Sequence, residues 1–381
     1  SAINTINSGF QVAFMAPTEI LARQHYNLAN KIFPSDINIE LISGKSEYKV
    51  KKEILKKLEN NKIDIIFGTH AIFQKKVIFK KLGLIIIDEQ HKFGVNQRKK
   101  LSDKGGNDCD VLLMTATPIP RTLTMTIYGD MDISIIREKP KNRKKIKTYS
   151  KLEAKIEDVL KFIKKEIQLN NQIFWVCPLI EESKKLDHTS AVKKFEYLKK
   201  KFPNQVSLLH GKVDLEEKNI ILNNFLKNKF KILVSTTIIE VGIDFPNANV
   251  IVIENANKFG LSQLHQLRGR VGRGDKESVC ILMFKSNLSD NAKKRIKILK
   301  DTNDGFIISE EDMKLRGFGD ILGFKQSGIK NFKLADPIQN ADLFLLAEKE
   351  MRRIENSNED IGKFKPLIKL YDRADIINDI A

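Results

Sequence analysis

The sequence lacks the features that would place it among membrane, secreted or zinc-binding proteins. No apolar run approaches the roughly 18 residues that a membrane-spanning helix needs. The first residues show no basic stretch followed by an apolar one, so we expect no signal peptide. The three cysteines, Cys109, Cys177 and Cys280, are far apart, which excludes a Cys-x-x-Cys zinc site and argues against a disulfide framework. Free thiols are typical of a reducing cytoplasm.

A complete phosphate-binding loop is also missing from these residues. The pattern G-x-x-x-x-G-K-[S/T] cradles nucleotide phosphates. Gly44, Lys45 and Ser46 match its end, but Ile39 stands where the leading glycine is required. The chain starts at Ser1 without an initiator methionine. We therefore expect a fragment of a longer gene product.

Arginine is scarce in a chain whose net charge is +18. Lysine outnumbers arginine 53 to 13 among the 66 basic residues. Charge alone leaves two interpretations open, a polyanionic partner or a compositional preference for lysine on solvated faces. A chain that mostly uses lysine is expected to keep arginine where its planar guanidinium is needed, because this group binds phosphate through paired hydrogen bonds. The candidates are clustered or follow apolar strand patterns: Arg23, Arg98, Arg121, Arg268, Arg270 and Arg273.

Short apolar runs alternate with helical patterns along most of the chain. Strands are predicted in the first part at Gln11–Pro17, Ile63–Thr69, Leu82–Glu89 and Asp110–Pro118, with helices at Glu19–Phe33 and Val50–Asn60. After an aperiodic basic stretch at 138–147, five more strands are predicted, at Gln172–Ile180, Val206–Gly211, Phe230–Ile238, Asn249–Ala256 and Glu277–Phe284. This alternation predicts an α/β fold of two lobes with mostly parallel sheets and helices on both faces. We assign residues 1–140 and 141–290 to the lobes, and 291–381 to a helical C-terminal region.

Polar residues gather where the predicted strands end. Ligands of open parallel sheets bind beyond the carboxyl ends of the strands, so these residues predict a site there: Thr18, Glu19, Thr69, His70, Asp88, Glu89, Thr115, Thr117, Thr236 and Thr237. Asp88 and Glu89 end the sequence IIIDE, and successive residues leaving a strand point to opposite sides. One carboxylate can hold hydrated Mg²⁺ while the other polarises a water. The alternative is a strand-end acid pair that caps the next helix.

Three further patterns carry candidate chemistry. In QLHQLRGRVGRG, two Gly-Arg pairs spaced by three residues would place Arg270 and Arg273 on one helical face to meet a γ-phosphate, or else a nucleic-acid backbone. The hydroxyls of Thr115 and Thr117 would contact the acids, or merely close a turn. In STTIIEVGIDFPN, Gly242 and Asp244 follow a strand, where the aspartate would bind ribose, position the arginines or form a turn.

These motifs, in this order, resemble those of the superfamily 2 helicases and translocases. The matching stretches are APTEILARQH, GTHAIF, DEQH, TATP, LLHGKVDLEEK, STTIIEVGIDFPN and QLHQLRGRVGRG. Narrower stretches resemble the RecG family of branch-migrating DNA helicases: DEQHKFGVNQR, TATPIPRTLTMT, WVCPLIEES and, near the C-terminus, RIKILKDTNDGFIISEEDMKLRGFGDILGFKQSG. The transcription-repair coupling factor shares some of them, but Gln90 and WVCPLIEES favour RecG. The resemblance covers nearly all of residues 10–335.

The resemblance implies a P-loop NTPase-type fold of two RecA-like lobes, ATP and Mg²⁺ as cofactors, and branched DNA such as stalled forks and Holliday junctions as substrate. It implies Mg²⁺ held by Asp88 through water, and catalysis by Asp88, Glu89, Arg270 and Arg273. Nucleotide contacts would come from Gly242, Asp244, Gln266 and His91. DNA contacts would come from Thr18, Arg23, Thr69, His70, Arg121, His210 and Thr236. Coupling would involve Thr115, Thr117, Arg295, Arg316 and Gln326.

The resemblance further implies a nucleoid-associated cytoplasmic monomer, no membrane partner, and single-stranded DNA-binding protein as a partner. Two family features are missing from these residues, the phosphate loop and the N-terminal wedge domain that recognises branched DNA. A DNA-binding remnant without ATP turnover is therefore the alternative to an active motor. The residues also leave translocation polarity and junction preference open.

Overall fold

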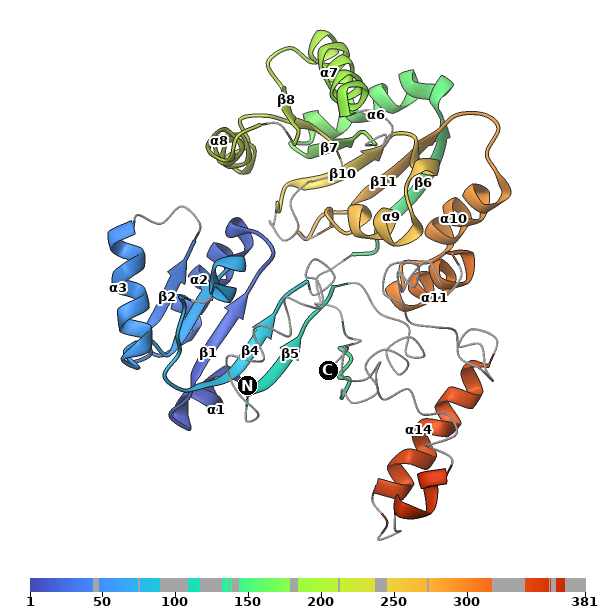
Figure 1. The fold of residues 1–381 in the computed structure, drawn as a ribbon. Helices are drawn as coiled ribbons and strands as arrows, with labels where there is room; N and C mark the ends of the chain where they lie inside the picture. The colour runs from blue at the N-terminus through green and yellow to red at the C-terminus, as the bar shows by residue number, and fades with distance from the viewer. Residues whose placement is uncertain are drawn as a thin grey trace. The chain divides into compact units, whose positions relative to one another are not determined.

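The computed structural model describes residues 1–43, 48–74, 76–89, 109–116, 132–136, 138, 144–178, 184–211, 213–236, 245–272, 274–316, 340–355, 357 and 361–366. These residues fall into two compact units, which are described separately (Figure 1). Lobe 1 contains the described residues up to Ala116, and lobe 2 contains those from Asp132 onward. No helix in the described residues is both long and apolar enough to span a membrane.

Lobe 1 is built on a five-stranded parallel sheet in the order β2-β3-β1-β4-β5. Its strands are β1 (Gln11–Met15), β2 (Ile39–Ile42), β3 (Ile65–Gly68), β4 (Leu82–Ile87) and β5 (Asp110–Leu113). Its helices are α1 (Ala2–Asn7), α2 (Glu19–Ile32), α3 (Tyr48–Glu59) and the short 3₁₀ helix η1 (His70–Phe73).

Helices cover both faces of this sheet, because successive strand residues point to opposite sides. Ala13 of β1 belongs to a buried cluster that includes Leu58 of α3. The neighbouring Val12 belongs to a second cluster, which Ala29 of α2 and Ile6 of α1 join from the other face. Full burial of a side chain such as Leu58 contributes about 1.5–3 kcal/mol.

Lobe 2 has a six-stranded parallel sheet in the order β6-β11-β10-β7-β9-β8. Its strands are β6 (Lys147–Leu152), β7 (Gln172–Val176), β8 (Val206–Leu209), β9 (Ile232–Ser235), β10 (Ala248–Ile253) and β11 (Val279–Phe284). Its α-helices are α6 (Ile156–Gln168), α7 (Lys184–Lys201), α8 (Leu215–Leu226), α9 (Leu261–Arg268), α10 (Asp290–Asp301), α11 (Gly305–Arg316) and α14 (Ala341–Glu355). Short 3₁₀ helices are η3 (Glu153–Lys155), η4 (Ala256–Lys258) and η5 (Ile361–Phe364).

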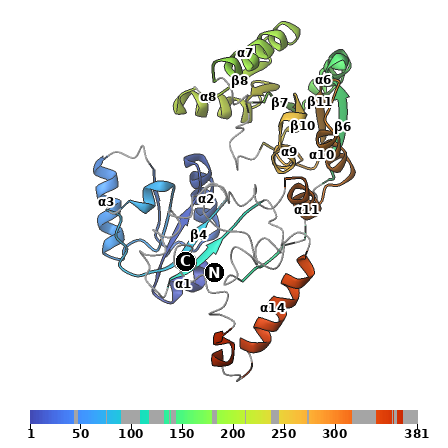
Figure 2. The same cartoon turned by 45° about the vertical axis from the view of Figure 1, so that its right-hand side comes forward.

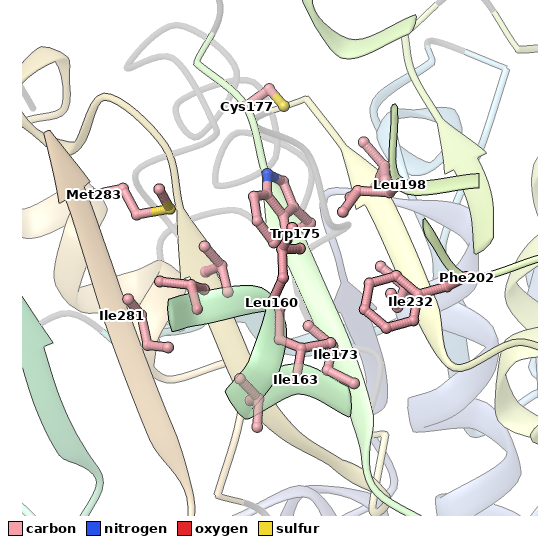
Figure 3. Close-up of a cluster of buried hydrophobic side chains, with 14 of the residues drawn as sticks. Leu160, Ile163, Ile173, Trp175, Cys177, Leu198, Phe202, Ile232, Ile281 and Met283 are labelled. Atoms are coloured by element: carbon pink, nitrogen blue, oxygen red, sulfur yellow. The ribbon is translucent and has the colours of Figure 1, made fainter. Parts of the chain in front are cut away.

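The core of lobe 2 also has two faces. Trp175 of β7 lies fully buried in the centre of one cluster, between Leu160 of α6 and Leu198 of α7 (Figure 3). On the other face Phe174 packs against Phe225 and Phe245, with ring centroids 5.3 and 5.4 Å away. In Figures 1 and 2 α10 and α11 lie side by side next to α9, and both helices contact α9.

The two lobes repeat one topology. The order β2-β3-β1-β4-β5 in lobe 1 matches β8-β9-β7-β10-β11 in lobe 2, and lobe 2 adds β6 beside β11. The first residues of the central strands make equivalent contacts, since the Gln11 side-chain amide donates to the Leu58 carbonyl at 2.9 Å and that of Gln172 to the Phe225 carbonyl at 2.7 Å. In each lobe that carbonyl belongs to the helix that precedes the neighbouring strand. The same hydrogen bond therefore joins equivalent elements in both lobes.

The predicted fold class is confirmed, with two parallel sheets and helices on both faces. The predicted helices at 19–33 and 50–60 agree with α2 and α3. Strands β2 and β6 were not predicted. β6 lies at the edge of its sheet and has no fully buried residue, so it lacks the apolar run that marks a central strand. The described helices of the predicted C-terminal region belong to the same compact unit as lobe 2.

Candidate functional site

Asp88 stands at the carboxyl end of β4 and is held on several sides. Its backbone N–H donates to the Met15 carbonyl at 2.9 Å, which continues the pairing of β4 with β1 by one residue. Its Oδ1 accepts from the Glu89 backbone N–H at 2.8 Å. Its Oδ2 lies 2.9 Å from Nε2 of His25, which α2 supplies. Both carboxylate oxygens accept contacts, yet 19% of the side chain remains exposed to solvent.

Glu89 adopts a left-handed backbone conformation with a φ of 51° and is 7% exposed. This conformation costs a residue with a Cβ of order 1–3 kcal/mol, and such strain gathers at functional sites. The chain turns sharply at this point, so two consecutive carboxylates stand at the end of a fully buried strand. The pattern IIIDE predicted this placement.

The other predicted residues of lobe 1 follow strands that end at the same edge of the sheet. Thr18 caps α2, because its Oγ1 accepts from the Leu21 N–H at 3.3 Å. Arg23 of α2 has a 57% exposed side chain and forms an ion pair with Glu19 at 3.5 Å. The remaining members follow the ends of β3 and β5: Thr69, His70 and Thr115.

In lobe 2 the matching edge carries His210 after β8 and Thr236 after β9. Thr236 is buried, and its N–H donates to the Leu209 carbonyl at 3.4 Å. Sequence reasoning missed an acid at this edge. Glu254 directly follows β10 and forms an ion pair with Lys194 of α7 at 2.6 Å, with both side chains largely buried. The apolar run before Glu254 was the available signal, and it resembles the run before Asp88.

The arginine-rich segment after α9 differs from the prediction. Arg268 is 1% exposed, and its guanidinium donates to the Leu299 and Thr302 carbonyls at 2.6 and 2.9 Å, at the C-terminal end of α10. The interpretation of Arg268 as a phosphate contact is therefore wrong. Burial lowers the pKa of this guanidinium, but its ordinary value lies far above neutral pH, so it keeps its charge.

The predicted single helical face for the two Gly-Arg pairs is also wrong. α9 ends at Arg268, so Arg270 lies past the helix, where it is 9% exposed. Gly272 has a left-handed φ of 77°, a conformation that glycine adopts at little cost and a continuing helix does not contain. Gln266 lies within α9.

Arg295 of α10 donates to the Phe259 and Asn257 carbonyls at 2.5 and 3.3 Å, and thereby ties α10 to the segment before α9. Arg316 is the last residue of α11. The other predicted site residues lie outside the described part of the chain: His91, Arg98, Thr117, Arg121, Thr237, Gly242, Asp244, Arg273 and Gln326.

The two carboxylates at the end of β4 suit Mg²⁺ better than a metal that needs three or more protein ligands. Among the residues described, no three His, Cys, Asp or Glu side chains come together as metal ligands. Mg²⁺ keeps several waters and uses one or two carboxylates together with substrate phosphates. Asp88 and Glu89 offer this donor set.

Comparison with known proteins identifies the family of each part of the chain. Residues 1–126 match the family model of the DEAD/DEAH box helicases, and residues 154–275 match the helicase conserved C-terminal domain. Residues 302–370 match the model for domain 3, C-terminal, of the ATP-dependent DNA helicase RecG.

The similar proteins of known name are longer than this chain. The ATP-dependent DNA helicase RecG of Bacillus subtilis is 49% identical over 338 residues, which is 88% of this chain and 49% of that protein. The RecG of Thermotoga maritima is 45% identical over 371 residues, or 97% of this chain and 47% of that protein. The chain thus spans about half the length of the curated relatives it matches.

Solved structures also include a similar RecG. A structure of RecG bound to a three-way DNA junction superposes with a TM-score of 0.70 at 42% identity, covering 88% of this chain and 44% of that one. A structure of S. cerevisiae Dbp5 bound to RNA and ADP-BeF₃ has a TM-score of 0.57 at 20% identity. The match covers 81% of both chains and shows likeness of fold alone. The matches to both lobes and to the RecG-specific region together show that the chain belongs to the RecG family.

Proposed function

We propose that this chain is the motor core of a RecG-type, ATP-dependent DNA helicase that moves along double-stranded DNA and remodels stalled forks and Holliday junctions. The observation that supports this most directly is the RecG match, which reaches 43–49% identity and extends from lobe 1 through the region at 302–370.

The proposed chemistry places hydrolysis at the end of β4. When bound, Mg²⁺-ATP supplies the phosphoryl group and part of the charge compensation. Asp88 would hold hydrated Mg²⁺, and Glu89 would accept a proton from the attacking water. Arg270 and Arg273 supply positive charge against the γ-phosphate, where negative charge develops in the transition state. Further nucleotide contacts come from Gly242, Asp244, Gln266 and His91.

The remaining predicted residues serve DNA. Branched DNA is the substrate that we propose, by analogy with the RecG that was solved on a three-way junction. Backbone contacts come from Thr18, Arg23, Thr69, His70, Arg121, His210 and Thr236. Coupling of hydrolysis to movement involves Thr115, Thr117, Arg295, Arg316 and Gln326. We further propose that the protein works as a monomer on nucleoid DNA, with single-stranded DNA-binding protein as a partner.

A second candidate, a DNA-binding remnant without ATP turnover, is favoured by one feature. The 381 residues contain no G-x-x-x-x-G-K-[S/T] sequence, so they lack the backbone amides and lysine that hold ATP phosphates. The two candidates differ in what happens when that loop is supplied.

The test compares ATP hydrolysis by residues 1–381 with that of the same chain preceded by a strand, a G-x-x-x-x-G-K-[S/T] loop and a helix. We expect DNA-stimulated turnover only in the extended chain, and a loss of roughly 100-fold or more in kcat on Glu89→Gln, since a general base contributes about that much. An extended chain that binds DNA without ATP turnover would establish the remnant instead. Turnover that Glu89→Gln leaves unchanged would contradict the assignment of Glu89 as the general base.

A further inference from the structure

We propose that a pocket between β6, β11 and α10 of lobe 2 is a docking site for an extended acidic peptide that carries apolar side chains. The pocket has a volume of about 380 Å³. It is formed by residues to which the proposed chemistry gives no role, so the proposal goes beyond ATP hydrolysis and DNA movement and does not depend on them.

The pocket lies at the edge of the lobe 2 sheet. Ser150 and Leu152 of β6 and Phe284 of β11 supply one side, and α10 supplies the other. α10 contacts β6 and lies beside it in Figures 1 and 2. β6 is the outermost strand, and within the described part of the chain it pairs with β11 alone. A ligand can therefore reach the pocket and the outer edge of β6 together.

Much of the lining is apolar. Ile296 of α10 is 6% exposed, and Leu152 at the end of β6 is 41% exposed. Phe284 and Leu288 are half-buried. Apolar surface that stays open and has a polar rim is typical of interaction sites. The lining therefore suits an apolar side chain of a partner.

Lysines supply the rim of the pocket. Lys293, Lys297 and Lys300 are spaced by four and three residues, so they lie on one face of α10. Lys285 directly follows β11, and all four side chains belong to exposed residues. Positive charge gathered around a concave surface attracts an anionic partner.

Nearby acids do not cancel this charge. Asp301 also lines the pocket. Asp290 forms an ion pair with Lys293 at 3.1 Å, but the two side chains are 88% and 63% exposed, and such exposed pairs are weak. No acid of the described residues forms an ion pair with the other three lysines of the rim. The pocket therefore retains positive charge that a ligand can meet.

An extended peptide fits the apolar lining, the lysine rim and the free strand edge at once. A peptide that adds a strand to an open sheet edge gains backbone hydrogen bonds, and its side chains enter neighbouring pockets. Apolar side chains of such a peptide can enter the pocket beside β6. Acidic side chains at neighbouring positions can meet the long lysine side chains at the rim.

Nucleic acid would also be attracted to the lysines, but it fits the lining less well. Its backbone consists of phosphates and sugars, and unpaired bases are bound mainly by stacking on aromatic side chains. Phe284 is the one aromatic residue among the described residues that line this pocket. The aliphatic part of the lining therefore favours a peptide.

The test measures fluorescence anisotropy of a fluorescein-labelled peptide of alternating aspartate and leucine, titrated with residues 1–381. A second peptide with serine in place of leucine keeps the charge and loses the apolar side chains. We expect the leucine peptide to bind at least about tenfold more tightly, because only its side chains bury apolar surface. We expect Lys297→Glu to weaken this binding at least about fivefold, because the change replaces an attraction with a repulsion.

Lys294→Glu is the matched control, because Lys294 is an exposed residue of the same helix that does not line the pocket. The change in charge is the same, and screening by salt should keep its effect within about twofold. Equal affinity of the two peptides would overturn the proposal, and so would equal effects of the two variants. No rise in anisotropy at up to roughly 100 μM protein would also overturn it.

A labelled DNA duplex tests the competing ligand. If Lys297→Glu weakens duplex binding about fivefold or more but leaves the leucine peptide within about twofold, the pocket binds nucleic acid and the proposal is wrong. Circular dichroism establishes that each variant folds. If Lys297→Glu does not fold, Lys297→Gln decides, since it removes the charge alone, and unchanged peptide affinity in that variant would refute the docking site.

Discussion

Replacing Arg268 distinguishes two roles for this residue. A structural role predicts a loss of stability, whereas a phosphate-binding role predicts a loss of ATP or DNA binding. Its guanidinium is buried and donates to the Leu299 and Thr302 carbonyls at the end of α10. It also lies 3.0 Å from Nδ1 of His265. The end of a helix carries partial negative charge from its last carbonyls, which a buried cation stabilises. The residue therefore joins α9 to α10.

The magnitude follows from these contacts. Hydrogen bonds to a charged group contribute about 1.5–3 kcal/mol each, so Arg268→Ala should lower the free energy of unfolding of lobe 2 by about 3–6 kcal/mol. Arg268→Lys keeps the charge but loses the planar fork, and we expect about half of that loss. Lys294→Ala is the control, because this exposed residue of α10 should change stability by less than about 0.5 kcal/mol.

The assay is urea unfolding followed by tryptophan fluorescence. The chain contains one tryptophan, Trp175, which is fully buried in lobe 2 and reports on this lobe alone. A loss below about 1 kcal/mol for Arg268→Ala would refute the structural role. A variant of unchanged stability that no longer binds ATP or DNA would restore the interpretation of Arg268 as a phosphate contact.

Three further outcomes follow from the charge and burial of other groups. DNA affinity should fall tenfold or more between roughly 50 and 200 mM salt, as counterion release requires, and a flat dependence in fluorescence anisotropy would show that the +18 charge has no such role. Lys194→Met leaves Glu254 unpaired in a largely buried site, so urea unfolding should show a loss of about 3–5 kcal/mol; an unchanged midpoint would contradict the ion pair's role. Burial raises the pKa of the Cys109 thiol to about 11 and that of Cys280 to about 12, so thiolate forms only as pH rises toward those values. A colorimetric thiol reagent at pH 7 should therefore react slowly with the folded chain, at the less buried Cys109 first, and rapid modification of Cys280 would contradict this.

The sheets could be predicted because their central strands are continuous apolar runs. Strand β4 is buried along its whole length, and the sequence LGLIII shows this directly. Edge strand β6 has the sequence KTYSKL, whose pairing with β11 depends on a neighbour more than 100 residues away. The local sequence contains no sign of such a neighbour, which is why no strand was predicted at residues 147–152.

The candidate functional site shows the same difference between features set by contiguous residues and features set by distant neighbours. Asp88 and Glu89 were identified because strand and acids are contiguous in sequence. His25 was missed, although it lies in a predicted helix, because its contact with Asp88 spans 63 positions. Arg268 and Arg270 share one motif, yet one caps α10 and the other does not lie on α9. Spacing alone does not distinguish an arginine that binds carbonyls from one that binds phosphate.

Movement along duplex DNA is the central claim, and displacement of a third strand from a DNA triplex measures it directly. The chain preceded by a strand, a G-x-x-x-x-G-K-[S/T] loop and a helix should displace the third strand only with ATP and Mg²⁺, and Glu89→Gln should abolish displacement while DNA binding is retained. ATP hydrolysis by the extended chain without displacement of the third strand would contradict the account of this chain as a double-stranded DNA motor.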